Sequence, residues 1–280
     1  MTKSKILVVG GTGYVGKRIQ QGARLVEGSF SDHQSLVDAV KEVDVVICTM
    51  SGVQFRSHNI LLQLKLVDAI KEAGNVKRFL PSEFGIDPSR MKYAVEYGKE
   101  TFDDKMTIRK AIEDAKIPYT YISANCLGGY FVGNLSQLTN SLLPPKDRVS
   151  IYGDGNREVV FMDEDDAATY TIKSVDDPRT LNKTLYLRPH ENILTHNQLV
   201  EKWEKLTNKT LQKVHISAQD FLASMKDLDY VYKAAFTRIY KIFYDGCLMN
   251  FEIGEGGEEA SKLYPEVRYT RMDEYLKRYL

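Results

Sequence analysis

The sequence predicts an α/β fold built on a parallel sheet, and three features of its first half support this prediction. Residues 5–9 form an apolar run that ends in a glycine-rich turn and continues as a helix. Residues 44–50 have the length and composition of a buried strand, and 76–80 and 119–124 are predicted as further strands. Segments with apolar residues at helical spacing separate these runs. Strands that alternate with helices pair in parallel, as in a doubly wound sheet.

The turn after the first strand carries Gly10, Gly13 and Gly16. A dinucleotide fold of the Rossmann type needs this order of strand, glycine turn and helix, because glycines allow the backbone to approach a pyrophosphate closely. The phosphates then accept hydrogen bonds from free N–H groups at the helix N-terminus. An ordinary glycine turn is the alternative, but a turn directly behind a strand favours a nucleotide site. The GxxGxxG spacing resembles that of extended and atypical short-chain dehydrogenases/reductases, which usually hold NADP(H).

Residues 23–30 have the composition of the next strand, but only residues 17–22 separate them from the glycine turn. A crossover between parallel strands takes at least about 10–12 residues, and six helical residues rise only about 9 Å. We infer that a segment is missing near position 20, so that residues 23–30 belong to the third strand. The missing part includes the end of the second strand, which normally carries the residue that contacts the ribose 2′ position. Glu27 could be mistaken for that residue.

The remaining elements of the first half follow regularly. Ser31–Gln34 has a capping-box pattern ahead of a helix, and a second helix from about residue 60 has Gly74 as its stop signal. A third helix spans about 99–115. Ligands bind outside the carboxyl ends of parallel strands. We therefore expect the site to be formed by the glycine turn, the loops at 49–58 and 81–85, and Asn125-Cys126.

After about residue 127 the alternation changes, so we predict a dinucleotide-binding domain at 1–127 and a smaller, mixed α/β substrate-binding region at 128–280. A strand within 181–190 can return to the first sheet. Val149 to Phe161 are typical of two short strands, and helical stretches follow near 196–207, 218–226, 230–244 and 270–279. Asp163 to Asp166 resemble a metal cluster, but the run begins a predicted helix without a partnering histidine, so we predict no metal site.

Composition excludes several classes of function. The chain of 280 residues balances 38 basic against 38 acidic residues and has no long run of like charge, which argues against nucleic-acid and membrane-surface partners. No apolar stretch has the length of a membrane span, and the N-terminus is typical of a strand rather than of a signal peptide. Its three cysteines lie far apart, as expected for reduced thiols in a cytoplasmic protein.

The predicted helix at 99–115 places two cations on its apolar face. Steps of 100° per residue put Lys105 and Arg109 in the same arc as Phe102, Ile108 and Ile112. Cations that point toward a sheet need anionic or polar company. A bound dinucleotide would supply it through phosphate or ribose oxygens; alternatively, both side chains extend to the rim of the sheet.

The acid/base pair of the common short-chain dehydrogenases is absent, because none of the 17 tyrosines is followed by lysine four residues later. A lone lysine can act as a general base when desolvation and neighbouring cations lower its pKa. Arg109 lies one turn from Lys105 and acts in that direction.

Several motifs resemble the isoflavone reductase-like, NmrA-related enzymes: GGTGYVG at 10–16, CTMSGV at 48–53, NVKRFLPSEFG at 75–85, Phe102-x-x-Lys105 and IYGDG at 151–155. FRSHN at 55–59 and LYPEV at 263–267 are most similar to the pinoresinol/lariciresinol reductases of plants. In that family a hydride from NADPH reaches a benzylic carbon. The resemblance implies that Lys105 takes the phenolic proton of a furofuran lignan, the ether opens to a quinone methide, and the hydride then adds.

The resemblance also implies binding residues. Pyrophosphate contacts come from Gly10, Gly11, Thr12, Gly13, Tyr14, Val15 and Gly16, the adenosine side is lined by Thr49, Met50 and Ser51, Arg109 contacts the cofactor, and Asn125 and Cys126 lie near the nicotinamide. The substrate is expected at Gly52, Val53, Met91, Tyr130, Phe131 and Arg238. Many relatives have a histidine where this chain has Arg238, which concerns the orientation of the substrate. A homodimer is also expected.

Three functions remain open from the sequence. The first is reduction of pinoresinol, with or without the second step through lariciresinol to secoisolariciresinol. The second keeps the chemistry but changes the substrate to a phenylcoumaran or an isoflavone. The third is a redox-sensing dinucleotide binder without catalysis, and such a sensor has no use for a lysine on the inner face of the helix.

Overall fold

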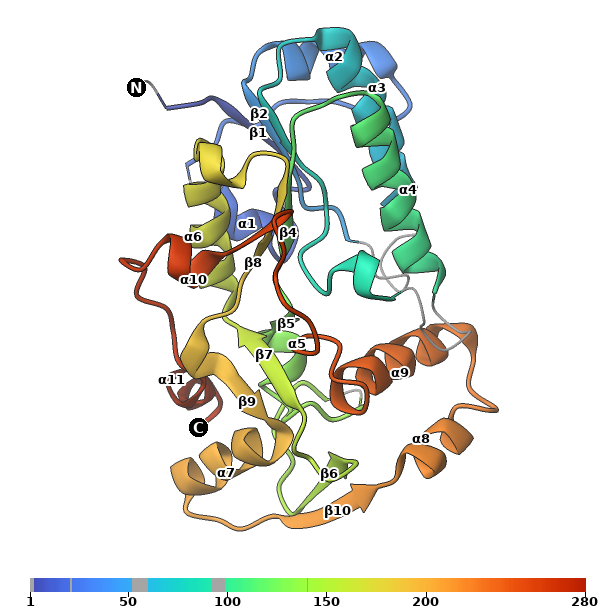
Figure 1. Ribbon diagram of the computed structural model, residues 1–280, viewed down its shortest axis with the longest axis vertical. Coiled ribbons are helices and arrows are strands. Elements are labelled where there is room, and N and C mark those ends of the chain that lie inside the picture. Colours follow the sequence, from blue (N-terminus) through green and yellow to red (C-terminus); the bar gives the residue numbers. More distant parts are fainter. Residues whose placement is uncertain (1–2, 21, 52–59, 92–98, 140) are drawn as a thin grey trace.

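A computed structural model describes residues 3–20, 22–51, 60–91, 99–139 and 141–280. It has an upper part built on a parallel sheet and a lower part that combines helices with short strands (Figure 1). β1 (Ile6–Val9), β2 (Val45–Cys48) and β3 (Arg78–Leu80) pair in parallel in that order. The chain therefore has the α/β class that its pattern predicts.

The sheet continues beyond β3 through a parallel bridge between Phe79 and Tyr119. β4 (Thr120–Ser123) follows and pairs in parallel with β8 (Lys183–Tyr186), which pairs in parallel with β11 (Gly257–Glu259). Two segments from the second half of the chain thus extend a sheet that the first half begins. The order across the sheet is β1-β2-β3-β4-β8-β11.

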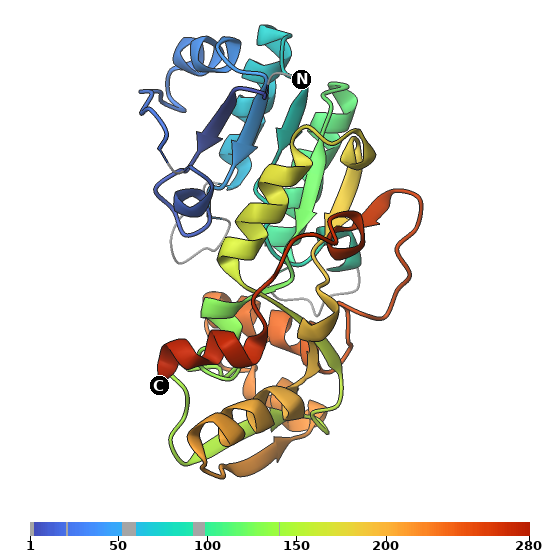
Figure 2. The same cartoon turned by 90° about the vertical axis from the view of Figure 1, so that its left-hand side faces the viewer.

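Helices cover both faces of this sheet. One face packs against α2 (His33–Lys41), α3 (Gln63–Ala73) and α4 (Glu100–Asp114), and the other against α6 (Glu164–Ser174), with the short α1 (Gly16–Ile19) beside it (Figure 2). Local signals explain these bounds. The side chain of Asp32 caps α2 by accepting from the backbone N–H of Ser35, and Gly74 ends α3 with a left-handed φ of 68°.

The strand predicted at 23–30 is wrong. Residues 22–29 form no strand with another element and are exposed; Leu25 has 88% of its surface accessible. α1 has only four residues, so the chain between it and α2 is too short to return to the sheet as a parallel neighbour of β1. Apolar composition favoured a strand here, but connection length prevents one.

The lower part contains two small sheets. β7 (Glu158–Met162) pairs in parallel with β5 (Cys126–Leu127) and antiparallel with β9 (Ile193–Thr195), while β6 (Arg148–Tyr152) pairs in parallel with β10 (Gln212–Ile216). The two strands predicted at 149–161 therefore exist but lie in different sheets.

The remaining helices are α5 (Gly128–Phe131), α7 (His196–Thr207), α8 (Ala218–Ser224), α9 (Tyr230–Phe243), α10 (Ala260–Leu263) and α11 (Met272–Leu276). Single 3-10 turns occupy Ile60–Leu62, Pro88–Met91, Pro178–Thr180, His190–Asn192 and Lys277–Tyr279.

The acidic run at 163–166 and the possibility of a membrane-spanning helix both arise from the sequence, and the described residues bear on each. Asp163 caps α6 by accepting from the backbone N–H groups of Asp165 and Asp166, which explains the acidic run as a helix start. The described part of the chain contains no group of acidic, histidine and cysteine side chains arranged to hold a metal ion. Within the same ranges, no helix is long and apolar enough to cross a bilayer.

Candidate active site

The glycine turn packs directly on the end of β2. Gly10 has a left-handed φ of 81°, and Thr49 donates its hydroxyl to the Gly10 carbonyl over 3.0 Å. A Cβ on Gly16 would overlap the Gly10 carbonyl and would lie 2.5 Å from the Thr49 hydroxyl oxygen. Gly16 is therefore required for packing, while Thr12 at the tip of the turn is exposed. This compact turn leaves the backbone accessible to a ligand, as a pyrophosphate requires.

The ends of β2, β3 and β4 are joined by hydrogen bonds. Ser82 donates its hydroxyl to the Met50 carbonyl over 2.5 Å. Asn125, with a left-handed φ of 55°, donates its backbone N–H to the Gly85 carbonyl over 3.0 Å. The segments expected at the carboxyl edge of the sheet thus do come together. Cys126, next to Asn125, is fully buried, and this burial raises the pKa of its thiol well above the usual value.

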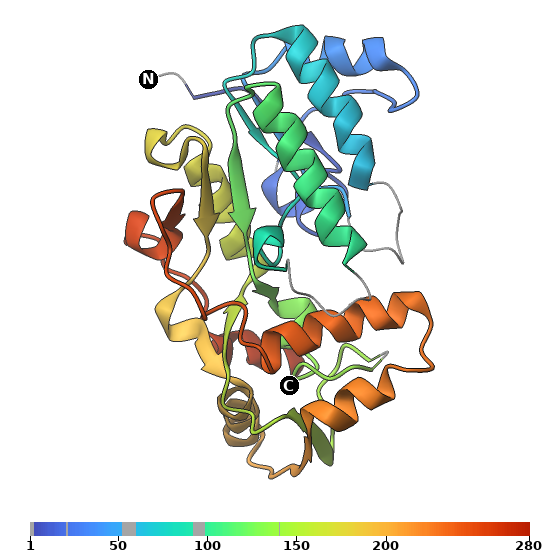
Figure 3. The ribbon, with the colours of Figure 1, turned by 45° about the vertical axis from the view of Figure 1, so that its right-hand side comes forward.

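Helix α4 packs along one face of the sheet (Figure 3), and Lys105 lies in its first half. Lys105 is partly buried and donates from Nζ to the backbone carbonyl of Glu83 over 3.2 Å. Burial lowers the pKa of Lys105 to about 8; the Glu83 carboxylate opposes this change, and the charges of Arg238 and Arg109 add to it. The amine is therefore held near the end of β3 with a much reduced tendency to stay protonated.

Arg109 has protein partners that the sequence analysis did not foresee. It is 6% exposed and donates from Nε to a Glu83 carboxylate oxygen over 2.7 Å and from Nη2 to the other oxygen. Its Nη1 lies 3.1 Å from a carboxylate oxygen of Asp87. Two buried carboxylates supply the negative charge that this inward-pointing cation needs. A bound phosphate is not required to explain its position, and the side chain does not extend to the rim of the sheet.

Asp87 joins this ion pair to the end of β8. Although burial favours its neutral form, Arg109 and hydrogen bonds from Tyr186 and Ser89 outweigh that effect and hold the pKa of Asp87 below its usual value. The Tyr186 hydroxyl donates to Asp87 over 2.6 Å. The carboxylate is therefore charged, and its partners all belong to the protein, so it serves to position Arg109.

Arg238 on α9 reaches the amino-terminal half of α4. Its guanidinium donates to the Thr101 hydroxyl over 3.1 Å and lies 5.6 Å from the centre of the Phe102 ring. Thr101 is one turn before Lys105, which explains why the charge of Arg238 acts on that lysine. The structure thus brings this expected substrate residue to the lysine.

The side chain of Tyr14 points away from the glycine turn to the second half of the chain. Its hydroxyl donates to the carboxylate of Glu164, which is 1% exposed. The same carboxylate accepts from the backbone N–H of Gly129 over 2.6 Å and from the Tyr275 hydroxyl over 3.1 Å. Glu164 therefore ties the glycine turn, α5 and the C-terminal helix to one point.

The remaining expected substrate residues have different surroundings. Tyr130 is 39% exposed, and its ring centre lies 5.0 Å from that of Tyr14. Phe131 is partly buried against the main apolar cluster of the lower part, and Met91 is buried within that cluster. Gly52 and Val53 lie outside the described residues, as does the motif at 55–59.

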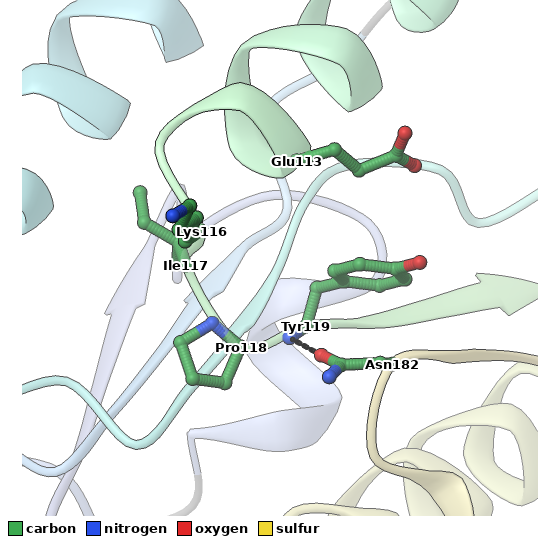
Figure 4. Close-up of a pocket in the computed structure, with 6 residues that line it drawn as sticks. All are labelled: Glu113, Lys116, Ile117, Pro118, Tyr119 and Asn182. Atoms are coloured by element: carbon green, nitrogen blue, oxygen red, sulfur yellow. Dashed lines mark hydrogen bonds between the residues drawn. The ribbon is translucent and has the colours of Figure 1, made fainter.

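A surface depression elsewhere does not belong to this site. Figure 4 shows it at the amino end of β4, where Tyr119 donates its backbone N–H to Asn182 over 3.1 Å. Asn125 follows the opposite end of the same strand. The depression therefore lies at the wrong edge of the sheet for a ligand of the glycine turn.

Sequence reasoning missed three residues that organise the site: Glu83, Asp87 and Glu164. Glu83 lies in a motif that the resemblance already singled out, directly after a predicted strand. Its position at a carboxyl edge was a usable signal. Glu164 gave no such signal, because an acidic residue in a first helical turn is ordinarily solvent-exposed.

Residues 17–276 match the NmrA-like family. An isoflavone reductase homolog of Lupinus albus is 63% identical over 313 aligned residues, and a bifunctional pinoresinol-lariciresinol reductase of Linum perenne is 58% identical over 315; each comparison covers 100% of both proteins. Among solved structures, AtPrR2 with NADP+ and (+)pinoresinol has a TM-score of 0.96 and 54% identity, covering 100% of both chains. Matches over this much of the chain, on the fold described above, show that it belongs to the NmrA-like family, in the branch that contains the pinoresinol-lariciresinol reductases.

Proposed function

We propose that the chain is an NADPH-dependent reductase that opens the benzylic ether of a furofuran lignan, converting pinoresinol to lariciresinol. The observation that carries this proposal is the placement of Lys105 near the carboxyl edge of the sheet, with a pKa of about 8. A general base works best when its pKa lies near the operating pH. The relatives named for pinoresinol reduction support the choice of substrate.

The glycine turn fits a dinucleotide. Its backbone approaches the end of β2 so closely that a side chain on Gly16 would not fit, and its tip is open. We propose that Gly10 to Gly16 hold the pyrophosphate, that Thr49 to Ser51 line the adenosine side and that Asn125 and Cys126 lie near the nicotinamide. When bound, the cofactor supplies the hydride that reduces the benzylic carbon.

Lys105 would accept the phenolic proton of the lignan on its neutral amine. The electrons of the phenolate then move through the ring, and the benzylic C–O bond breaks with its electron pair on the ether oxygen. This forms a quinone methide, which accepts hydride and becomes the phenolate of the product. The alkoxide takes a proton back from the Lys105 ammonium, and the phenolate takes a proton from solvent. Arg109, Glu83 and Asp87 act as positioning residues, because their charges are used within the protein.

We propose Tyr130 and Phe131 as a wall of the substrate site, together with Arg238 near Lys105. In that position Arg238 would orient the lignan, a role that the resemblance gives to a histidine. A second reduction, from lariciresinol to secoisolariciresinol, uses the same chemistry at the remaining ether and is proposed on the same basis.

An isoflavone is the alternative substrate, favoured by the 63% identity to the isoflavone reductase homolog of Lupinus albus. The deciding experiment incubates the protein and NADPH separately with racemic pinoresinol, lariciresinol, a phenylcoumaran and an isoflavone, followed by chiral product analysis over time. Lariciresinol formed from pinoresinol faster than product from the phenylcoumaran or the isoflavone supports the proposal. Product from the isoflavone alone would replace it, and inert substrates with retained dinucleotide binding would indicate a sensor.

A further inference from the structure

β1 lies at the edge of its sheet in the described part of the chain. It pairs with β2, and the described residues on its other side provide no strand. A dinucleotide fold of the Rossmann type has its second strand on that side, and the residue that contacts the ribose 2′ position follows that strand. The position that normally supports the adenosine end of the cofactor is therefore without its usual scaffold here.

The connection that should build this scaffold is short and exposed. Between α1 and α2 the described residues are irregular, and two apolar side chains, Leu25 and Val26, are 88% and 51% exposed. Apolar residues from a strand that packs in a sheet are normally covered. Leu25 and Val26 are residues typical of a buried strand, but no neighbouring element among the described residues covers them.

The comparison with the lupin protein gives a difference in length of the size expected for such a scaffold. The alignment with the lupin protein spans 313 residues and covers all of both chains, whereas this chain has 280 residues. The relative therefore has 33 residues that this chain lacks, which is the size of one helix, one strand and their connections.

No described cation near the turn forms a built site for a further phosphate. Arg18 is bound to Asp165 at 2.9 Å and to the Tyr14 carbonyl, while Lys17 and Arg24 are exposed at the surface. An exposed lysine without fixed neighbours discriminates poorly, because holding its side chain costs conformational entropy.

We infer that the described part of this chain provides no subsite for the adenosine 2′-phosphate, so that the protein binds NADPH and NADH through their common pyrophosphate and nicotinamide halves. This inference rests on the proposed function, since it assumes that the glycine turn binds a nicotinamide dinucleotide. The consequence is a reductase of this family whose choice between the two cofactors is set by their supply rather than by its own contacts.

Titration calorimetry with the purified chain tests the inference without turnover. NADPH, NADH, 2′,5′-ADP and ADP are the ligands, and the matched control is a chimera in which the lupin protein's segment replaces this chain's segment between α1 and α2. We expect dissociation constants for NADPH and NADH within about threefold, and 2′,5′-ADP no tighter than ADP. The chimera should prefer NADPH by about tenfold or more, because it regains charge-assisted hydrogen bonds to the phosphate.

Each outcome decides the inference. A tenfold preference for NADPH in the natural chain overturns it, while pinoresinol reduction by the same protein would leave the proposed function standing. Equal binding of both cofactors without any reduction supports the inference and removes the proposed function. Absence of dinucleotide binding in the natural chain overturns both.

Discussion

Lys105 donates a hydrogen bond from Nζ to the backbone carbonyl of Glu83 over 3.2 Å, and this contact joins the inner face of α4 to the end of β3. The carboxylate of Glu83 is taken by Arg109. The lysine is thus held by a neutral acceptor while the nearest carboxylate is largely neutralised by another cation. This arrangement fixes the position of the amine, and burial outweighs the charge of Glu83 and lowers the pKa of Lys105 to about 8, which is what a general base near neutral pH requires.

Replacing Lys105 with methionine should remove turnover while leaving the fold and the cofactor site. We expect kcat for pinoresinol to fall by about 10²- to 10⁴-fold, the usual contribution of a general base. The dissociation constant for NADPH should change by less than about threefold, because the glycine turn does not contact this side chain. Single-turnover kinetics and calorimetry measure the two effects.

Lys110→Met is the matched control, since Lys110 lies on the same helix but is exposed and pairs with Asp114. It should retain turnover. Full turnover in Lys105→Met would remove the lysine from the mechanism.

The pH dependence of kcat/KM should follow the protonation of Lys105. Burial lowers its pKa to about 8, so the neutral amine predominates above that pH. Below it, the rate should fall about tenfold per pH unit, because each unit reduces the neutral fraction tenfold. Arg238→Gln should move the limb to higher pH, since it removes a cation that disfavours the ammonium form, whereas Arg238→Lys keeps the charge and should move it less. A profile that is flat from pH 6 to 9 would contradict this assignment.

The sequence predicted the inner face of α4 correctly but not the partners of its cations. Phe102, Ile108 and Ile112 are buried as the helical spacing requires, and Arg109 is buried with them. Helical periodicity depends on neighbours within one element. The pairing of Arg109 with Glu83 depends instead on how α4 lies over β3, which a pattern of residues does not contain.

A similar difference explains the error at 23–30. Strand propensity is a local property, whereas a strand also needs a connection long enough to reach its neighbour. Only six residues separate the glycine turn from this segment, so its connection and its composition are in conflict. The structure resolves it by leaving the segment irregular and exposed.

Lys105 should also destabilise the folded chain at neutral pH. Its pKa is lowered from 10.5 to about 8 on folding, so the unfolded chain binds this proton more tightly and stability rises with pH between those two values. Below pH 8 the full cost is present. Lys105→Met should therefore be more stable at pH 7 by about 2–3 kcal/mol, at about 1.4 kcal/mol per pKa unit with allowance for partial exposure. Urea unfolding at pH 7 and pH 10 checks this, because the difference should shrink at the higher pH.

The Arg109 ion pair should contribute to stability mainly through the cost of breaking it. Arg109→Leu would leave the carboxylates of Glu83 and Asp87 buried without their cation, which costs about 3–5 kcal/mol. Arg109→Lys cannot bind both Glu83 oxygens while reaching Asp87, but it keeps the positive charge. It should therefore lose less stability than Arg109→Leu. Thermal unfolding ranks the two variants, and a smaller loss in Arg109→Leu than in Arg109→Lys would contradict the role given to this pair.

Glu164 should couple the glycine turn to the substrate wall. Its buried carboxylate accepts hydrogen bonds from Tyr14, Gly129 and Tyr275. An amide at this position has one acceptor oxygen, and its NH₂ group would face a donor instead of accepting from it. We expect Glu164→Gln to destabilise the chain by about 1–3 kcal/mol and to raise the dissociation constant for NADPH and the KM for lignan together.

Both constants should rise because Tyr14 belongs to the turn, whereas Gly129 precedes Tyr130 on the proposed substrate wall. Thr169→Ala is the control, since Thr169 is exposed on the same helix, where its hydroxyl donates to the Asp165 carbonyl, and its loss should affect neither constant by more than about twofold. If Glu164→Gln changed only the unfolding midpoint and left both constants unaltered, the carboxylate would stabilise the fold without linking the two sites. The paired rise is therefore the measurement that separates a positioning role from a structural one.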